Sequence, residues 1–362
     1  MKILKNITVF TMVMLLSVST VLEAREKNIS NFSSSASNLV DSTGTFDGNK
    51  IYADVANNGL FLDYHVSGDS ALEWPKGTGV HSIFQSALWM GATVNGSIRT
   101  IVGDYTQDMG PGPWGGDPLA AVHRIYKVEK SMLASPLDFA DFQEWPVEFG
   151  APWVDVDGDG VYTPLPGGTD HPEFLGDQVL WFVSNDGDPA YKLNFGTSPM
   201  NVEIQTTMFG FDRPDVFGDM VFLKQLVINK GSDDLVDTYM GLWSDPDLGY
   251  AGDDFVGCDV ALGMGYVWND GDDSQYSTLD IGTPAAGYDF FQGPMVPCED
   301  GDSEEVCPTE GAKMFGTRHP GMKNLKMSSF AFYINGDATY TDPSDETAVS
   351  YTHLTLPTTS SV

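Results

Sequence analysis

The segment Ser86-Ala-Leu-Trp-Met-Gly-Ala-Thr-Val94 is followed by Asn95-Gly96 and then by Ser97-Ile-Arg-Thr-Ile-Val-Gly-Asp-Tyr105. Both longer runs are rich in residues that favour strands. The dipeptide Asn-Gly between two such runs is the strongest short signal for a β-hairpin. The sequence therefore predicts two antiparallel strands here, from which a sheet begins.

Further strand-like segments lie on both sides of this hairpin. Before it, Leu60, Leu62, Tyr64 and Val66 alternate with their neighbours at strand spacing. After it, strands are predicted at 124–128, 178–184, 202–211, 220–229, 236–243, 260–268 and 329–334, separated by clusters of Gly, Asp, Asn and Pro. One short helix is predicted at 138–145. Many short strands with very little helix predict an all-β, antiparallel β-sandwich-type fold, as one sandwich or two packed sandwiches.

The N-terminal residues have the pattern of a signal peptide. Lys2 and Lys5 precede an apolar run at 7–22, and a small residue, Ala24, follows it. A membrane anchor is the alternative, but the run is shorter than the ~20 apolar residues of a membrane span. No later segment is apolar enough to cross a bilayer. We therefore predict a signal peptide at 1–24 and a protein that is secreted or held on the outer surface of a bacterial cell.

The rest of the chain divides into three parts. Residues 25–46 are rich in Ser, Asn and Thr and are expected to form a flexible leader. Residues 47–348 form the β-rich extracellular region, with a subdivision near residue 146. Residues 349–362 contain no acidic residue and resemble translated sequencing-adapter read-through, with an ordinary polar tail as the alternative. Read-through would mean that the natural protein continues beyond this point.

The charge of the chain limits its partners. Asp and Glu number 51 against 18 Lys and Arg, which gives a formal net charge of -33. Such a surface repels phosphate backbones and anionic lipid heads. We therefore expect neither nucleic acid nor a membrane surface among the partners, and divalent cations as counter-charge. With the predicted export, the expected partner is an unknown extracellular protein or polysaccharide.

One loop has the spacing of a calcium site. In Asp155-Val-Asp157-Gly-Asp159-Gly160-Val161, carboxylates alternate along the chain before a glycine. This spacing directs the side chains of Asp155, Asp157 and Asp159 to one centre, and the backbone carbonyl of Val161 adds another oxygen. Many flexible oxygen ligands favour Ca²⁺ over Mg²⁺. The alternative is an unliganded Asp/Gly turn.

The loop departs from the EF-hand pattern, because Pro166 stands where the bidentate Glu should be. It is closer to the helix-free calcium loops of dockerin-like or thrombospondin-type modules, in which later acids complete the shell. Asp170, Glu173 and Asp177 are the candidates for that role. Three weaker acidic clusters, at 185–188, 245–254 and 269–273, are expected to be mostly turns, with at most one second cation site.

The three cysteines allow one disulfide. Cys298 and Cys307 flank a short acidic loop, and an exported protein reaches an oxidising environment, so we predict that they pair. Cys258 is then left over. A small buried apolar side chain is favoured for it over a reactive thiol.

Motifs for catalysis are mostly missing. The sequence has no Gly-x-Ser-x-Gly elbow, no His-Glu-x-x-His and no phosphate loop. Glycoside cleavage by paired carboxylates stays open, because the required separation is spatial and invisible in a sequence. The eight Trp could stack on sugar rings, although at strand spacing they are more often core residues.

Four longer phrases carry a resemblance to known proteins. They are Ala-Leu-Glu-Trp-Pro-Lys-Gly at 71–77, Gln-Val-Leu-Trp-Phe-Val at 178–183, Gly-Asp-Asp-Phe-Val-Gly-Cys-Asp at 252–259 and Pro-Ala-Ala-Gly-Tyr-Asp-Phe-Phe-Gln-Gly-Pro at 284–294. Together they resemble a group of large, uncharacterised secreted proteins that often end in a type IX secretion sorting domain. The resemblance implies export across the outer membrane and surface attachment or release. It implies no enzymatic activity.

The sequence thus predicts a non-catalytic, calcium-stabilised, secreted or cell-surface β module of unknown binding role. The alternative is a carbohydrate-active protein, either a glycosidase or a sugar-binding unit.

Overall fold

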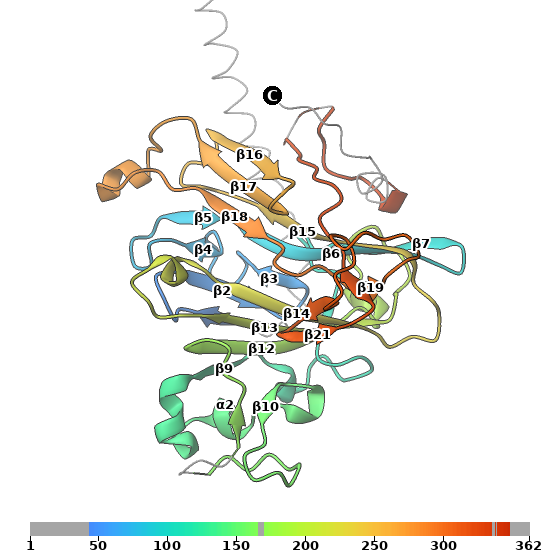
Figure 1. The fold of residues 1–362 in the computed structure, drawn as a ribbon. Coiled ribbons are helices and arrows are strands. Elements are labelled where there is room, and N and C mark those ends of the chain that lie inside the picture. The colour runs from blue at the N-terminus through green and yellow to red at the C-terminus, as the bar shows by residue number, and fades with distance from the viewer. Residues whose placement is uncertain (1–42, 166–169, 335–336, 338, 348–362) are drawn as a thin grey trace, which may run out of the picture.

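The computed structural model describes residues 43–165, 170–334, 337 and 339–347. The predicted signal peptide, residues 25–42 of the predicted leader and the tail at 349–362 lie outside the described residues. The described part is an all-β fold of antiparallel strands arranged in layers (Figure 1). This confirms the predicted fold class.

The central sheet has the strand order β14-β13-β12-β8, with β9 also paired to β12. Its strands are β8 (Gly110–Pro111), β9 (Tyr126–Glu129), β12 (Gln178–Asn185), β13 (Val202–Gly210) and β14 (Phe222–Asn229).

Two further sheets face it. One contains β1 (Thr43–Phe46), β2 (Tyr52–Ala56), β4 (Leu72–Glu73) and β5 (His81–Ile83). The other contains β3 (Leu60–Leu62), β6 (Gln85–Val94), β7 (Ser97–Ile101) and β15 (Val236–Asp245).

Smaller sheets and short helical turns complete the described chain. The strands are β10 (Trp153–Val154), β11 (His171–Pro172), β16 (Asp254–Asp259), β17 (Met264–Asn269), β18 (Ala286–Asp289), β19 (Met295–Pro297), β20 (Ala312–Met314), β21 (Thr317–His319) and β22 (Met322–Asn324). The helical turns are η2 (Ala121–His123), η3 (Lys130–Ala134), η4 (Pro136–Asp138), α2 (Ala140–Gln143), η5 (Val147–Phe149), η6 (Pro189–Tyr191), η7 (Val216–Asp219) and η8 (Tyr276–Leu279).

The predicted hairpin is present as β6 and β7. Val94 pairs with Ser97, and the register continues to Met90 and Ile101. Asn95 and Gly96 have φ angles of 52° and 80°, the left-handed conformation that tight hairpin turns require. β6 is also paired with β15 on its other edge, so the hairpin is anchored in the sheet.

The main core lies between the central sheet and the two sheets that face it. Leu180 and Phe182 of β12 pack with Phe46 and Val55 of the first facing sheet. Ile204 of β13 belongs to a second cluster with residues of β6 and β7. Two antiparallel sheets that bury their inner faces against each other make the sandwich-type arrangement.

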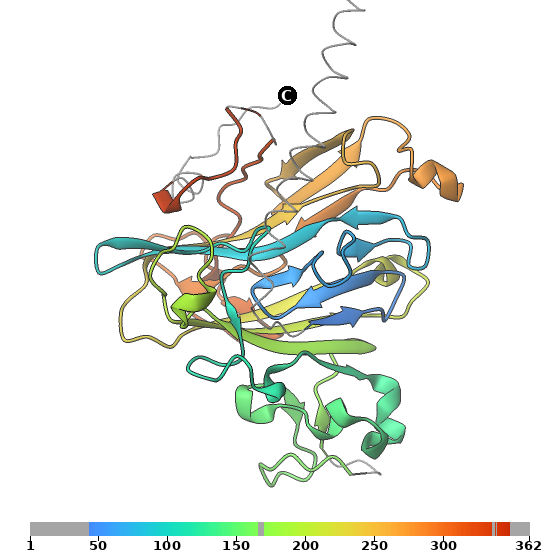
Figure 2. The same cartoon turned by 180° about the vertical axis from the view of Figure 1, so that it is seen from behind.

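The opposite face of the central sheet is also covered. Val179, Trp181 and Val183 point the other way along β12 and pack with Phe142 and Trp145. Because both faces of β12 are covered, all of its residues are buried. In a strand with one solvent-exposed face, buried and exposed residues would alternate. The covering segment contains η3 to β11 and lies beneath the sheet in both views (Figures 1 and 2). It carries the acidic loop.

Two sequence predictions near the chain ends are wrong. The segment 43–46 is no part of a loose leader, because it forms β1 and pairs with β2. The segment 329–334 is no strand among the described residues: Ile334 N–H donates to Tyr340 O at 2.7 Å, and Phe332 stacks on Tyr340 at 4.9 Å. The apolar side chains of this segment stay exposed, with Phe330 at 38%, Phe332 at 39% and Ile334 at 47%.

Other boundaries differ in detail. The strand predicted through Val66 ends at Leu62, because the chain turns at residues 64–67, where Gly68 N–H donates to Tyr64 O at 2.8 Å. The helix predicted at 138–145 is reduced to the single turn α2, preceded by η4. β16 is not predicted from the sequence, because Gly257 and the acidic residues at the two ends of the strand, Asp254 and Asp259, are uncommon in strands.

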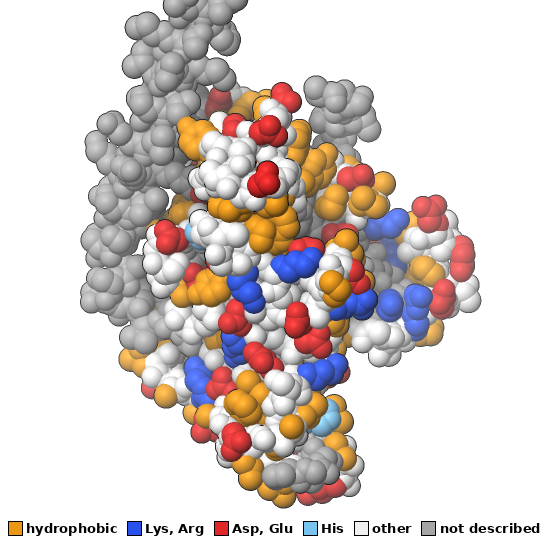
Figure 3. Space-filling view, turned by 90° about the vertical axis from the view of Figure 1, so that its left-hand side faces the viewer, with side chains coloured by type: hydrophobic (Ala, Val, Ile, Leu, Met, Phe, Trp, Pro, Cys, Tyr) orange, Lys and Arg blue, Asp and Glu red, His pale blue; other side chains and the backbone are white. Residues whose placement is uncertain are grey.

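The charged surface is mixed on the face shown in Figure 3. Lys and Arg side chains there lie among Asp and Glu side chains and form no separate basic patch. Ion pairs of this kind include Lys50 with Asp219 at 2.7 Å and Arg124 with Asp141 at 2.9 Å. In the described part of the chain, no helix is long and apolar enough to cross a membrane.

Candidate metal site

The acidic loop is held at both ends by the short hairpin of β10 and β11. Trp153 pairs with Pro172 and Val154 with His171, so residues 155 and 170 begin and end the connection. Tyr162, in the middle of the loop, donates its hydroxyl to Phe142 O at 2.6 Å and packs edge-on against Trp153. The loop is therefore fixed to the segment that covers β12.

The three alternating carboxylates also shape the backbone of the loop. Asp155 accepts hydrogen bonds from Gly158 N–H at 2.7 Å and Gly160 N–H at 2.9 Å. Asp159 accepts from Val161 N–H at 2.7 Å. Gly158 and Gly160 have φ angles of 78° and 76°. Residues other than glycine rarely adopt this left-handed conformation. A side chain at either glycine would have open space, so the requirement there is conformational and not steric.

Asp170 differs from the other acids of the loop because it is buried, at 1% exposure. Its Oδ1 accepts from Val156 N–H at 2.9 Å, and its Oδ2 accepts from the N–H and hydroxyl of Thr163 at 2.8 and 3.2 Å. The hydrogen bond from Thr163 N–H is the main cause that lowers the pKa of the Asp170 carboxyl. The carboxylate is thus negatively charged at neutral pH.

These features bring four carboxylates together. Oxygen atoms of Asp155, Asp157, Asp159 and Asp170 all lie within 4.8 Å of one another. Oxygens bound to one Ca²⁺ at about 2.4 Å can be no farther apart than about 4.8 Å, so the spacing fits a shared ion. The first three acids are exposed, which leaves room for water ligands.

Of the three acids considered for completing the shell, only Asp170 joins this group among the described residues. Glu173 lies 3.8 Å from Lys224 Nζ. Asp177 accepts from Asp212 N–H at 3.0 Å, in a turn beside the central sheet. The side chain of Val161 is exposed, and its N–H is used by Asp159, as described above.

The weaker acidic clusters serve as turns and caps. Asp188 caps η6 through Ala190 N–H at 2.9 Å. Asp273 accepts from Gln275 and Tyr276 N–H, each at 2.8 Å. Within the described residues, the Asp155 loop alone brings three or more potential metal ligands together.

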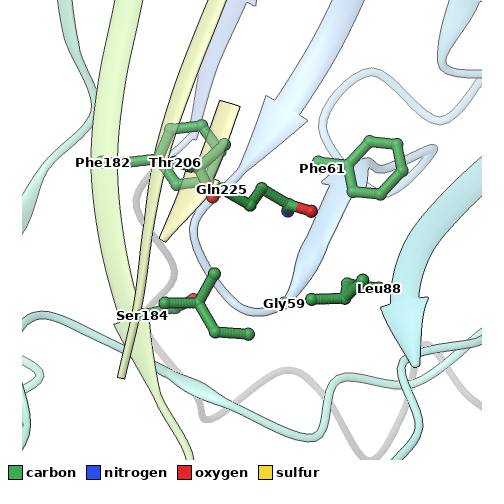
Figure 4. A pocket seen from close by; sticks show the side chains of 8 residues that line it. Gly59, Phe61, Leu88, Phe182, Ser184, Thr206 and Gln225 are labelled. Carbon is green, nitrogen blue, oxygen red and sulfur yellow. The ribbon is translucent and has the colours of Figure 1, made fainter. Parts of the chain in front are cut away.

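A pocket between the layers is too small for a substrate. It lies between Gly59, Phe61 and Leu88 on one side and the central sheet on the other (Figure 4). The central sheet contributes Phe182, Ser184, Ile204, Thr206 and Gln225. It has room for about one water molecule, whereas small-molecule sites occupy roughly 300–1,000 Å³. It is a packing gap and not a binding cleft.

The cysteines are arranged as a disulfide and a thiol. Cys298 and Cys307 are bonded, with 5.9 Å between their Cα atoms, as the sequence predicts. Cys258 has a free thiol in β16 and is partly exposed, so the expectation of a buried side chain is wrong. Phe255 and Val256, which point to opposite faces of the same strand, are 49% and 39% exposed, so neither face of β16 is fully covered.

Sequence reasoning missed a second group of charged residues. Lys192, Asp108 and Asp186 meet in the protein interior. They are separated by as many as 84 residues along the chain, and no local spacing marks them.

Comparisons with known proteins found no match to this chain among protein-family models, curated proteins or solved structures.

Proposed function

We propose that this protein is a non-catalytic β module, secreted or held on a bacterial cell surface, that is stabilised by one Ca²⁺ and binds an extracellular protein or polysaccharide. The observation that carries the proposal is the meeting of Asp155, Asp157, Asp159 and Asp170 within 4.8 Å. Export is supported by the signal-like N-terminus and by the disulfide.

The ion would act on the fold through its place in the chain. The loop connects β10 to β11, and this hairpin belongs to the segment that covers β12. Without a cation, three exposed carboxylates repel one another across a short distance. A bound Ca²⁺ would remove that repulsion and join the exposed arm of the loop to buried Asp170. Calcium binding would therefore keep the covering segment closed over the outer face of the central sheet.

Calorimetric titration tests the metal site directly. We expect the chelator-treated protein to bind one Ca²⁺ with clear preference over Mg²⁺. Asp157→Asn should weaken binding strongly, because it removes one charge while an amide oxygen can still accept from Asp159 N–H. The matched control is Asp270→Asn, another exposed Asp that precedes glycine, which should leave binding unchanged. Absence of binding by the parent would contradict the proposal.

A sugar-binding surface is the second candidate function. Phe255 and Trp268 are directly opposite each other in β16 and β17, with ring centroids 5.8 Å apart. They are 49% and 37% exposed. Exposed aromatic rings can stack on sugar rings. Binding of the parent on a glycan array, lost in Trp268→Ala, would favour this candidate, and no glycan signal above background would remove it.

A further inference from the structure

A buried cluster of charged side chains lies at a junction between the sheets. Lys192 follows η6, Asp108 lies between β7 and β8, and Asp186 directly follows β12. The side chains of Lys192, Asp108 and Asp186 are 1%, 0% and 0% exposed. Lys192 Nζ lies 2.8 Å from Asp108 Oδ2 and 3.9 Å from Asp186 Oδ2, and it also donates to the carbonyl of Thr100.

The cluster has more negative than positive groups. Two carboxyls face one amine, and burial raises the pKa of both Asp108 and Asp186. Buried charges are costly even when they are paired. A chemical change that removes the charges of Lys192 and Asp108 together would relieve this cost.

We propose that Lys192 Nζ and Asp108 Cγ are joined after folding by an intramolecular amide bond, and that Asp186 relays the proton. The ammonium first gives a proton to the Asp108 carboxylate, which leaves a neutral amine and a carboxylic acid. The amine nitrogen attacks Cγ, a proton passes from nitrogen through Asp186 to the departing hydroxyl, and water leaves. An ammonium and a carboxylate thus become one amide and one water, with no oxidant or cofactor.

The surroundings of Asp108 suit this reaction. Val102 N–H donates to its Oδ2 at 2.9 Å, and Asn194 N–H donates to its Oδ1 at 3.2 Å. Such fixed backbone donors stabilise the negative charge that develops on oxygen when a nucleophile adds to the carbon. The 2.8 Å contact holds the reacting groups together in the folded state, which replaces a bimolecular encounter.

Asp186 is equally well fixed as a proton relay. Its two oxygens accept from Met200 N–H and Val202 N–H, each at 2.7 Å. Ile101, Met109, Met200 and Val202 are buried in the adjoining core. An apolar environment keeps water away from the product, so the amide would not be hydrolysed.

The bond would close a loop that spans two layers of the fold. It would join the β7–β8 connection, which runs from the facing sheet of β7 to the central sheet, to the β12–β13 connection within the central sheet. A covalent link of this kind restricts the unfolded chain, as a disulfide does. Unlike a disulfide, it would survive reduction, which suits a protein exposed outside the cell.

Intact-mass spectrometry of the purified, reduced and denatured parent protein tests the proposal. We expect a mass lower than the sequence mass by one water molecule. We also expect a branched proteolytic peptide that joins the Asp108 segment to the Lys192 segment. A parent protein at its full sequence mass would overturn the proposal, and would identify the cluster as an ordinary buried ion pair.

Two variants and one treatment exclude other sources of water loss. Succinimides at Asp-Gly sequences also lose water, but hydroxylamine cleaves them and leaves an amide bond intact. Lys192→Arg keeps the positive charge without the amine and should show its full sequence mass. Asp186→Asn should reduce the joined fraction severalfold. Water loss that persists in Lys192→Arg would contradict the assigned bond. Full joining in Asp186→Asn would contradict the assigned relay. If a variant does not fold, the branched peptide of the parent still shows whether the bond is present.

Discussion

The backbone N–H of Val156 donates a hydrogen bond of 2.9 Å to Oδ1 of Asp170, fourteen residues along the chain. This bond ties the start of the acidic loop to its end, and Thr163 N–H binds the other oxygen of the same carboxylate. Asp170 therefore has two separate tasks, as an anchor of the loop and as a candidate ligand.

The two tasks can be separated by mutation. In Asp170→Asn, the amide nitrogen cannot accept from Thr163 N–H, so the variant should melt a few degrees below the parent even in chelator. Asp157→Asn should melt at the parent's midpoint or slightly above it in chelator, because it removes one of the repelling charges and its turn bond is kept. Differential scanning calorimetry in chelator distinguishes them. Equal midpoints for parent and Asp170→Asn would show that Asp170 is no anchor.

The doubly covered strand β12 predicts where the fold is most sensitive. Trp181 is 2% exposed and packs against the segment that carries the acidic loop. Trp181→Ala should lower the free energy of unfolding by about 3–5 kcal/mol, the range for large aromatic side chains removed from a core. Trp268→Ala, at an exposed tryptophan, is the control and should cost much less. Urea unfolding measures both, and similar losses would contradict the double covering of β12.

Asp254 predicts a pH dependence of stability. Burial raises its pKa from 3.8 to about 7. Because the folded state then holds a proton that the unfolded state has released, stability falls as the pH rises from about 4 to about 7. Asp254→Asn removes this titration while an amide oxygen can still accept from Leu248 N–H. Urea unfolding should show that the free energy of unfolding of the variant, minus that of the parent, increases from pH about 4 to about 7. A difference that stays constant with pH would show that the pKa of Asp254 is not raised.

The cysteines predict a defined redox state. Intact-mass analysis of the protein purified without reductant should show one disulfide, and alkylation should label one thiol. Peptide mapping should place the label on Cys258, which is partly exposed, and the bridge between Cys298 and Cys307. Two or three labelled cysteines would contradict the assignment.

Local features of the fold could be predicted from the sequence. Asn95-Gly96 places its hairpin because the turn needs left-handed backbone angles that these residues accept. The β12 and β13 runs are visible from their apolar and β-branched residues alone. The segment 329–334 shows the limit of such reasoning, since an alternating pattern forms a strand only when another strand offers hydrogen bonds.

The candidate metal site was predictable in its local part. The spacing of Asp155, Asp157 and Asp159 directs their side chains to one centre. Asp170 reaches the same centre only because the pairing of β10 with β11 brings the two ends of the loop together. That pairing depends on the packing of the covering segment and has no signature in the loop. The meeting of Lys192 with Asp108 depends on the pairing of β8 with β12, which brings distant parts of the chain together, so no spacing rule could reveal it.

The most direct test of the account is the thermal midpoint of the parent in chelator and in millimolar calcium. A site filled at about a hundred times its dissociation constant adds roughly 2.7 kcal/mol to the folded state. For a domain of this size we expect an upward shift of a few degrees in the parent. Asp270→Asn should show the same shift and Asp157→Asn should lose most of it. A parent midpoint that does not move with calcium, or an Asp157→Asn variant that keeps the full shift, would contradict the calcium site.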